Sequence, residues 1–193
     1  ICTWNRAEML AATLDSLATV RAPRDCAVDV LVVDNNSSDG SSELLRERMA
    51  GWPLGRLHAL FEPRQGKQFA LNMAIARGRE LDCEVLAFTD DDILFPPDWL
   101  EQVNAVFSSD GPALAGGRTS LQWPEDGRPA WYDDAMDAVV GGVDLGEARL
   151  CPPPPGYSPA GANLVARMGL FDRVGCFSEA HFRHMDFEFG QRR

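Results

Sequence analysis

The stretch LAFTDDDILFPPDWL, residues 86–100, joins an apolar run to three consecutive aspartates. The residues before Asp90 are typical of a buried strand, and apolar residues resume at Ile93. Three adjacent carboxylates repel one another. The triplet is therefore either a solvated turn before a helix that begins near Pro97 and is capped by Asp98, or a site where a cation cancels the repulsion. Carboxylate oxygens are the ligands that hard divalent ions prefer, and a strand end holds them rigidly.

Strand-like and helix-like segments alternate ahead of this stretch. Runs of β-branched and apolar residues end in polar clusters, and the segments between them have apolar residues at helical spacing. This alternation predicts an α/β fold with a Rossmann-like, mostly parallel sheet that is flanked by helices on both faces. The predicted strands are 1–3, 28–33, 57–61 and 83–89. The first predicted helix follows the turn at 4–6 and has its apolar residues at Leu10, Leu14, Leu17 and Val20; two more are predicted at 41–49 and 66–81.

The pattern is looser after residue 110. Residues 113–121 suggest another strand, 161–166 return to extended structure, and 168–174 form a short helix. Residues 122–160 are rich in Pro, Gly and acidic side chains, and the four prolines at 152–155 exclude a helix or a central strand. This variable loop either carries substrate specificity or is an ordinary surface loop.

Polar clusters follow three of the predicted strands. They comprise the turn 3–6, the loop 34–39 and the triplet 90–92. In open α/β sheets, ligands bind outside the carboxyl ends of the strands, so we expect these three groups to meet at one edge of the sheet.

Two of the candidate groups have both a structural and a functional interpretation. Asp34 is either a turn-forming residue or a hydrogen-bond acceptor for a nucleobase or a ribose hydroxyl. Arg64, Gly66 and Lys67 precede a predicted helix, whose dipole and free N–H groups favour a phosphate; alternatively, the two cations are simply solvated.

The composition is that of one globular domain: 193 residues, 45% hydrophobic and 24% charged. The net charge of -11 argues against nucleic acid as a partner. Five scattered cysteines without a C-x-x-C pair indicate a reducing, cytoplasmic setting. No apolar run approaches the roughly 20 residues needed to span a bilayer. Because the chain starts at Ile1 and stops at Arg193 without a termination signal, we expect a fragment trimmed at both ends.

Six segments together resemble the family 2 glycosyltransferases, and the resemblance covers essentially the whole chain. Each segment alone is a weak signal, but all six occur in the family's order. They are ICTWNRAEML, LVVDNNSSDGS, EPRQGKQFALNMAI, FTDDDILFPPDWL, SPAGANLVARMGLFDRVGCF and HMDFEFGQR.

The resemblance implies the nucleotide-sugar-binding fold called GT-A, with a nucleotide-sugar-binding half over 1–110 and an acceptor-side half over 111–193 of a single catalytic domain. It implies metal-dependent transfer of a sugar, most often with inversion, from a nucleotide diphosphosugar to a sugar, lipid-linked or other hydroxyl acceptor. Mn²⁺ or Mg²⁺ would be the cofactor. Polysaccharide, glycolipid or glycoconjugate biosynthesis, including that of cell walls, would be the setting, in the cytoplasm or at the inner face of a membrane.

The resemblance also implies roles for individual residues. Asp34 would hold the base, Asp90 the ribose or the metal's shell, and Asp92 the metal directly. Asp186 would be the general base. The remaining donor-site residues would be Thr3, Asn5, Arg6, Arg64, Gly66, Lys67 and Asp91, and the acceptor-side residues would be Gly161, Asn163 and Glu188.

One position departs from the family pattern and keeps an alternative open. Met185 stands where the family usually has a glutamate, which puts acceptor binding in doubt and leaves a non-catalytic nucleotide-sugar-binding domain as an alternative. His181 and His184 either tune Asp186 or lie on the surface. A nucleotidyltransferase would need a glycine-rich loop after the first strand, and an aspartate-dependent phosphatase would need a nucleophilic aspartate there; the sequence Thr3-Trp4-Asn5 provides neither.

Overall fold

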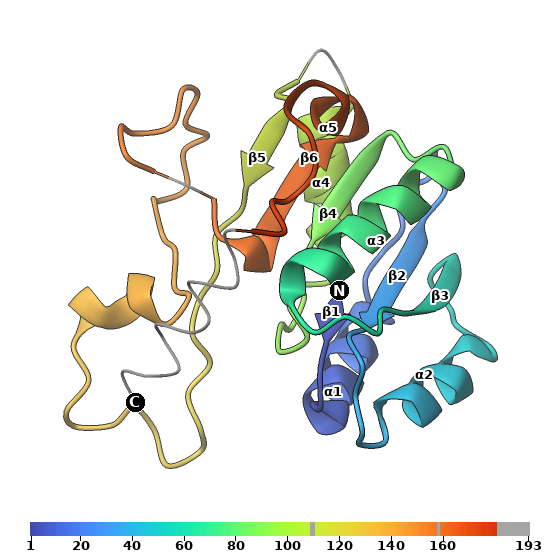
Figure 1. Cartoon of the computed structure of the whole chain (residues 1–193). Helices are drawn as coiled ribbons and strands as arrows, with labels where there is room; N and C mark the ends of the chain where they lie inside the picture. The colour runs from blue at the N-terminus through green and yellow to red at the C-terminus, as the bar shows by residue number, and fades with distance from the viewer. Residues whose placement is uncertain (109–110, 158, 181–193) are drawn as a thin grey trace.

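A computed structural model describes residues 1–108, 111–157 and 159–180 (Figure 1). The strands and helices alternate over the first half as the sequence pattern predicts. In chain order the elements are β1 (Cys2–Thr3), α1 (Ala7–Leu17), β2 (Asp29–Asp34), α2 (Ser41–Met49), β3 (Arg56–Phe61), α3 (Lys67–Glu80), β4 (Val85–Phe88), α4 (Trp99–Phe107), β5 (Leu114–Gly116), η1 (Asp134–Val139), η2 (Gly161–Asn163), β6 (Leu164–Arg167) and α5 (Met168–Val174).

The strands form two three-stranded sheets that meet at β1 and β4. One sheet has the order β1-β2-β3 and is parallel, and the other has the order β4-β6-β5. A parallel bridge between Cys2 and Asp90 connects the two sheets. Because β6 pairs antiparallel with both β4 and β5, it alone among the described strands runs against the common direction. The predicted mostly parallel sheet is therefore confirmed.

Helices cover both faces of this sheet, as predicted. Val30 and Val32 of β2 point to one face, where they pack in a cluster with the apolar side of α1. Leu31 and Val33 point to the other face, against Ala70 and Ala74 of α3. Figure 1 shows α3 lying across the sheet. The alternation of side chains along β2 thus buries both of its faces, which explains its continuous apolar run.

A third apolar cluster joins the two halves of the chain. The Phe88 ring at the end of β4 makes edge contacts with Phe171 of α5 and with Phe177, at centroid distances of 6.0 and 5.7 Å. Leu71 and Ile75 of α3 belong to the same cluster. The segment that follows α5 is therefore packed against the carboxyl end of β4.

Two predicted elements differ in detail. The strand expected over 113–121 ends at Gly116, because the Gly117 N–H bonds Asn163 O in η2 and the chain then leaves the sheet. The helix after the triplet begins at Trp99 with Asp98 in the N-cap position, as predicted. The Asp98 carboxylate, however, accepts from the Gln102 side chain at 3.3 Å rather than capping a backbone N–H.

Residues 117–160 loop away from the body that contains α1 to α3 (Figure 1). This stretch holds the short helix η1 and a bridge between Thr119 and Val143. The Arg128 guanidinium lies 4.8 Å from the centre of the Tyr132 ring and bonds the Asp134 carboxylate at 2.6 Å. The loop thus has a small polar and aromatic cluster of its own. Its role in substrate specificity and the division of the chain at residue 110 remain predictions.

Within the described residues, the structure contains no helix with the length and apolar character required to cross a bilayer.

Candidate functional site

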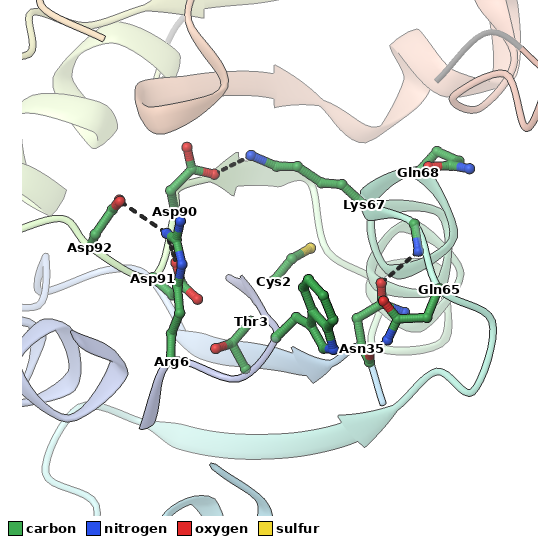
Figure 2. Close-up of a pocket in the computed structure, with 12 residues that line it drawn as sticks. Cys2, Thr3, Arg6, Asn35, Gln65, Lys67, Gln68, Asp90, Asp91 and Asp92 are labelled. Carbon is green, nitrogen blue, oxygen red and sulfur yellow. Dashed lines mark hydrogen bonds and ion pairs between the residues drawn. The ribbon is translucent and has the colours of Figure 1, made fainter. Parts of the chain in front are cut away.

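The carboxyl ends of β1, β2 and β4 and the start of α3 surround a cavity of about 810 Å³. Its wall is built from three short stretches: the turn after β1, the loop before α3, and the triplet Asp90, Asp91 and Asp92 (Figure 2). Asn35, which follows β2, completes the wall. The polar groups expected to meet at one edge of the sheet are therefore largely brought together there.

Two cationic side chains of the chain itself neutralise most of the triplet's charge. Arg6 Nη1 lies 3.1 Å from Asp91 Oδ1 and 3.2 Å from Asp92 Oδ2. The Lys67 ammonium pairs with Asp90 Oδ1. Burial lowers the pKa of the Arg6 guanidinium, but the neighbouring carboxylates of Asp91 and Asp92 outweigh burial, so this pKa is raised overall. Arg6 and Lys67 together therefore offset two of the triplet's three negative charges.

The three carboxylates of the triplet differ in their access to the cavity. The Asp91 side chain is 6% exposed and faces Arg6, whereas the Asp92 side chain is 47% exposed. The Thr13 hydroxyl donates to Asp91 O at 2.8 Å, which fixes the backbone in the middle of the triplet. Asp90 and Asp92 therefore present oxygens to the cavity, and Asp91 serves mainly to hold Arg6.

Asp90 and Asp92 fit the divalent ion that the sequence predicts. No group of three or more His, Cys, Asp or Glu side chains that could hold a metal occurs in the part of the chain that the structure describes. Mg²⁺-type sites, however, commonly use only one or two carboxylates together with substrate phosphates and water. Two carboxylates beside a cavity of this size match that donor set, so Asp90 and Asp92 could hold Mn²⁺ or Mg²⁺ jointly with a phosphorylated ligand.

Lys67 is the single lysine of the chain. Apart from the histidines, all its other basic side chains are arginines. It is the first residue of α3, and Figure 2 shows its extended side chain reaching from this helix to Asp90. A Cβ placed on Gly161, in η2, would lie 4.0 Å from Lys67 Nζ. Gly161 therefore borders the ion pair, which brings one predicted acceptor-side residue next to the cavity.

The loop before α3 depends on Gly66 and Asn35. Gly66 has a φ of 139°, which only glycine adopts readily. The Asn35 side chain donates to Glu62 O at 3.1 Å and to Arg64 O at 2.7 Å, and its Oδ1 accepts from Gly66 N at 2.8 Å. The Gly66 amide, which was expected to contact a phosphate, is thus bonded to Asn35, and the glycine contributes its backbone shape instead.

Arg64 lies outside the cavity wall, although the sequence placed it with the phosphate-binding residues. Its guanidinium forms two hydrogen bonds of 3.0 Å with the buried carboxylate of Glu62 and a longer one, 3.4 Å, with Glu179. It also lies 4.3 Å above the Phe69 ring. Its hydrogen bonds lower the pKa of Glu62. Arg64 thus links the loop before α3 to the segment that follows α5.

Asp34 is brought to the sheet edge but not to the cavity wall. The residue is 2% exposed. Its Oδ1 accepts from Ser37 N at 2.8 Å, and its Oδ2 accepts from the Ser42 hydroxyl at 2.5 Å. In this state the carboxylate closes the loop between β2 and α2, as in the turn-forming interpretation.

Thr3 and Asn5 support the site in different ways. The Thr3 hydroxyl is buried at the cavity wall and has no hydrogen-bond partner among the residues that the structure describes. Asn5 has a φ of 53°, and its side-chain oxygen accepts from Ser38 N at 2.7 Å. The turn after β1 is thereby tied to the loop after β2.

Asn163 connects η2 to α4 and to the segment that follows β5. Its Oδ1 accepts from the Trp99 indole at 3.2 Å, and its Nδ2 donates to Arg118 O at 3.2 Å. A Cβ at Gly117 would lie 2.1 Å from this Nδ2, so the close approach requires glycine. Asn163 therefore makes structural contacts in this state.

Several residues of the cavity wall were not singled out from the sequence as site residues. Trp4 is 54% exposed at the wall, although a tryptophan normally buries most of its surface. The other wall residues in this group are Cys2, Asn35, Gln65 and Gln68. The one available signal was the position of Trp4 directly after a buried strand. The roles of Asn35 and Gln65 depend on partners about thirty residues away, which local patterns do not reveal.

The segment after α5 is anchored to α3 by a reciprocal pair of hydrogen bonds. Asn72 Nδ2 donates to Phe177 O at 2.9 Å, and Phe177 N donates to Asn72 Oδ1 at 2.9 Å. The chain then continues toward the predicted catalytic residues. Asp186 and Glu188 lie outside the described residues, as do Met185 and the two nearby histidines, His181 and His184.

Residues 1–142 match the family described as Glycosyl transferase family 2. Glycosyltransferase AglE of Haloferax volcanii is 31% identical to the chain over 178 residues, which are 92% of this chain and 54% of that protein. The mannosyltransferase PcManGT of Pyrobaculum calidifontis, solved with GDP-Man and Mn²⁺, matches with a TM-score of 0.65 at 24% identity, over 92% of this chain and 46% of that one. TarS residues 1–349 of S. aureus, solved with UDP-GlcNAc, match with a TM-score of 0.66 at 18% identity, over 92% and 47%. The chain thus spans about half the length of these relatives.

Proposed function

Because the chain belongs to glycosyl transferase family 2, we propose that it transfers a sugar from a nucleotide diphosphosugar to an acceptor hydroxyl. The transfer inverts the configuration at the sugar carbon and uses Mn²⁺ or Mg²⁺. The likeness to solved glycosyltransferases gives the chain the expected GT-A fold. Two of these neighbours were solved with nucleotide sugars, GDP-Man and UDP-GlcNAc, which supports a donor of the same chemical class here.

The observation that carries this proposal is the charge pattern of the cavity. Two carboxylates that can share a divalent ion, Asp90 and Asp92, lie beside two cations that can pair with phosphate oxygens, Arg6 and Lys67. A metal–diphosphate pair has the complementary pattern of charges. The acidic protein, with a net charge of -11, otherwise offers little to attract a phosphorylated ligand.

Asp90 and Asp92 would hold the divalent ion against the donor's diphosphate. The ion supplies electrostatic stabilisation of the nucleoside diphosphate as this leaving group gains negative charge. Arg6 and Lys67 add positive charge on the same side of the cavity, and Asp91 keeps Arg6 oriented toward it. In the proposed reaction, the bond between the sugar carbon and the diphosphate oxygen breaks, and the bond to the acceptor oxygen forms on the opposite face of the sugar.

Trp4 and Thr3 are suited to hold the nucleoside part of the donor. The exposed Trp4 side chain offers an aromatic face on which a base can stack. The buried Thr3 hydroxyl gains a partner if a donor hydroxyl or phosphate oxygen reaches it. Asp34 remains a candidate for binding the base, which would require one of its present bonds to Ser37 or Ser42 to open.

Asp186 is the proposed general base, which accepts the proton of the acceptor hydroxyl as that oxygen attacks the sugar carbon. The proposal for Asp186 rests on the resemblance of HMDFEFGQR to the family's motif, since Asp186 lies outside the described residues. The acceptor is a sugar, lipid-linked or other hydroxyl compound of polysaccharide, glycolipid or glycoconjugate biosynthesis in the cytoplasm or at the membrane's inner face. Gly161, Asn163 and Glu188 remain its candidate contacts.

A thermal-shift panel tests the proposal. UDP, GDP, dTDP and CDP are each added with Mn²⁺ or with EDTA, because a ligand that binds only the folded state raises the melting temperature. We expect at least one nucleotide to stabilise the wild type in Mn²⁺ but not in EDTA. Asp92→Asn should weaken this binding about tenfold or more, because loss of even an outer-shell partner of a metal ligand typically costs that much. Transfer from the matching radiolabelled nucleotide sugar then separates an enzyme from a binding domain. Failure of all four nucleotides to bind in Mn²⁺ would overturn the proposal.

A further inference from the structure

We propose that Lys67 is an exchangeable counter-ion, which pairs with Asp90 before the donor binds and with the donor's diphosphate afterwards. The inference rests on the proposed function and adds a reason why metal and nucleotide bind together. It starts from the ion pair that crosses the cavity between the start of α3 and the end of β4 (Figure 2). Both side chains are partly exposed, 43% for Lys67 and 30% for Asp90, so the pair can open without unpacking the core.

The charges around the cavity weaken the binding of the metal ion alone and of the diphosphate alone. Three carboxylates face two cations, so the wall keeps one net negative charge and disfavours a diphosphate that arrives without a metal. A divalent ion that arrives alone must compete with the Lys67 ammonium for the Asp90 carboxylate. With both ligands bound, Asp90 would hold the ion and the Lys67 ammonium would be free to pair with phosphate oxygens. Each ligand thus removes the obstacle to the other.

The choice of lysine at this position supports an exchanging role. The chain uses arginine for every other cation apart from its histidines, and the arginines near the site are fixed by several contacts at once. Arg64 forms a two-pronged pair with Glu62, and Arg6 bridges two carboxylates. An ammonium group is compact, carried on a flexible stem, and has three rotatable donors, so it changes partners more readily than a planar guanidinium. The first residue of a helix is also a place where phosphate is favoured.

Exchange predicts that removal of the ammonium has opposite effects on the two ligands. In Lys67→Met, no ammonium competes with Mn²⁺ for the Asp90 carboxylate. Mn²⁺ alone should therefore bind roughly two- to fivefold more tightly, which corresponds to the free energy of a partly exposed ion pair. Nucleoside diphosphate in saturating Mn²⁺ should bind more weakly, because the phosphate loses a partner. The factor by which each ligand raises the other's affinity, about 5–150-fold for typical coupled sites, should shrink.

Titration calorimetry measures these affinities for wild type, Lys67→Met and two controls. Lys67→Arg keeps the charge, so Mn²⁺ alone should bind within about twofold of wild type. Arg21→Met removes a cation from an exposed pair with Glu101 and should change neither affinity. The probes are Mn²⁺ alone and then UDP or GDP in Mn²⁺. If Lys67→Met leaves the affinity for Mn²⁺ alone unchanged or weaker while the wild type still binds a nucleotide, the exchange is wrong and the proposed function stands. A wild type that binds none of UDP, GDP, dTDP and CDP in Mn²⁺ overturns both.

The single lysine also permits a direct view of the exchange. Reductive methylation with ¹³C-formaldehyde preserves the charge and labels Lys67 and the chain's amino terminus, and the Lys67→Arg spectrum identifies the lysine signal. We expect this signal to move little with Mg²⁺ alone and to shift clearly when UDP or GDP is added with Mg²⁺. A lysine signal that stays at its initial position while nucleotide binds in the same sample would contradict the exchange.

Discussion

Four aspartates at one edge of the sheet illustrate how surroundings divide a single side-chain type into different roles. Asp34 is buried and accepts from two neutral donors, and Asp91 is buried against the Arg6 guanidinium. Asp90 and Asp92 reach the cavity and keep oxygens available. Because carboxylates that face solvent can exchange partners without leaving a buried charge unpaired, only these two are suited to bind an ion that comes and goes.

Asp34→Ala tests whether this buried carboxylate serves the loop, the nucleobase or both. The substitution leaves the Ser37 N–H without its partner, so the free energy of unfolding should fall by about 1–3 kcal/mol. If Asp34 also holds the base, the affinity for the free nucleoside should drop about tenfold or more, the cost of a hydrogen bond to a charged group. Ser42→Ala is the control, because it removes a partner of Asp34 and keeps the carboxylate. A destabilised Asp34→Ala variant with unchanged nucleoside affinity would limit Asp34 to the loop.

Asp186→Asn separates catalysis from binding. The amide keeps the size of the side chain but does not accept a proton, so turnover should fall by roughly 10²–10⁴-fold, the range that general base catalysis supplies. The donor's dissociation constant should barely change. Calorimetry with the donor and a transfer assay on the same preparations give both values. Glu188→Gln serves as the comparison, and its effect should lie in the KM for the acceptor. Wild-type turnover in Asp186→Asn would require a different base, with Glu188, His181 and His184 as the candidates.

At the scale of elements, α3 connects every part of the site. Its first residue, Lys67, reaches the cavity, and Ala70 and Ala74 pack on β2. Asn72 lies between these two alanines, on a different side of the helix, and binds the backbone of Phe177. Helix α3 therefore contacts the cavity, the sheet and the segment after α5. The start of α3 therefore has to be held accurately, and Gly66 is the residue that sets it.

Gly66→Ala should damage both stability and binding. A side chain at a φ of 139° is strained, and its Cβ would lie 2.7 Å from the Gln68 side chain. We expect the free energy of unfolding to fall by about 1–3 kcal/mol, as is typical of a strained backbone position, and nucleotide affinity to fall with it. Gly40→Ala is the matched control, because Gly40 precedes α2 with an ordinary φ of -77° and a Cβ there meets nothing within 4 Å. Urea unfolding of both variants checks the difference, and equal stability of the two would contradict the role of Gly66.

At the scale of the whole molecule, the sequence predicts the layers of the fold better than its contacts. Strands β2 and β4 were recognisable because apolar runs end abruptly in polar residues, and the bounds of α2 and α5 match the predicted ones. Periodicity identifies which faces are buried. Periodicity does not identify which distant strand or loop a segment pairs with. The antiparallel direction of β6 and the early end of β5 at Gly116 are therefore known only from the structure.

The candidate site shows the same limit. The meeting of the triplet with the turn after β1 followed from strand topology, and Figure 2 bears out this convergence. The pairing of individual charges did not follow, because Arg6 and Asp91 are 85 residues apart and local spacing carries no record of such a contact. Asn35 was overlooked for the same reason: the three hydrogen bonds of its side chain all go to backbone groups of the loop before α3.

The many paired carboxylates make the whole fold sensitive to acid. Hydrogen bonds from Arg64 hold the pKa of Glu62 below its ordinary value of 4.5, and a hydrogen bond from Ser41 lowers that of Asp39. Because these pKa values are lower in the folded state, the unfolded chain takes up protons first as the pH falls. The stabilisation from the paired carboxylates is therefore fully present above the pKa of the unfolded chain and is lost as the pH falls through the pKa of the folded state. We expect the melting temperature to be level near neutral pH and to fall progressively below about pH 5. Glu62→Gln should melt lower at neutral pH, with a shallower decline in acid. Circular dichroism gives the melting temperature of both proteins at each pH from 7 to 3. If the melting temperature falls by the same amount in both, the pair of Glu62 with Arg64 contributes nothing to acid sensitivity.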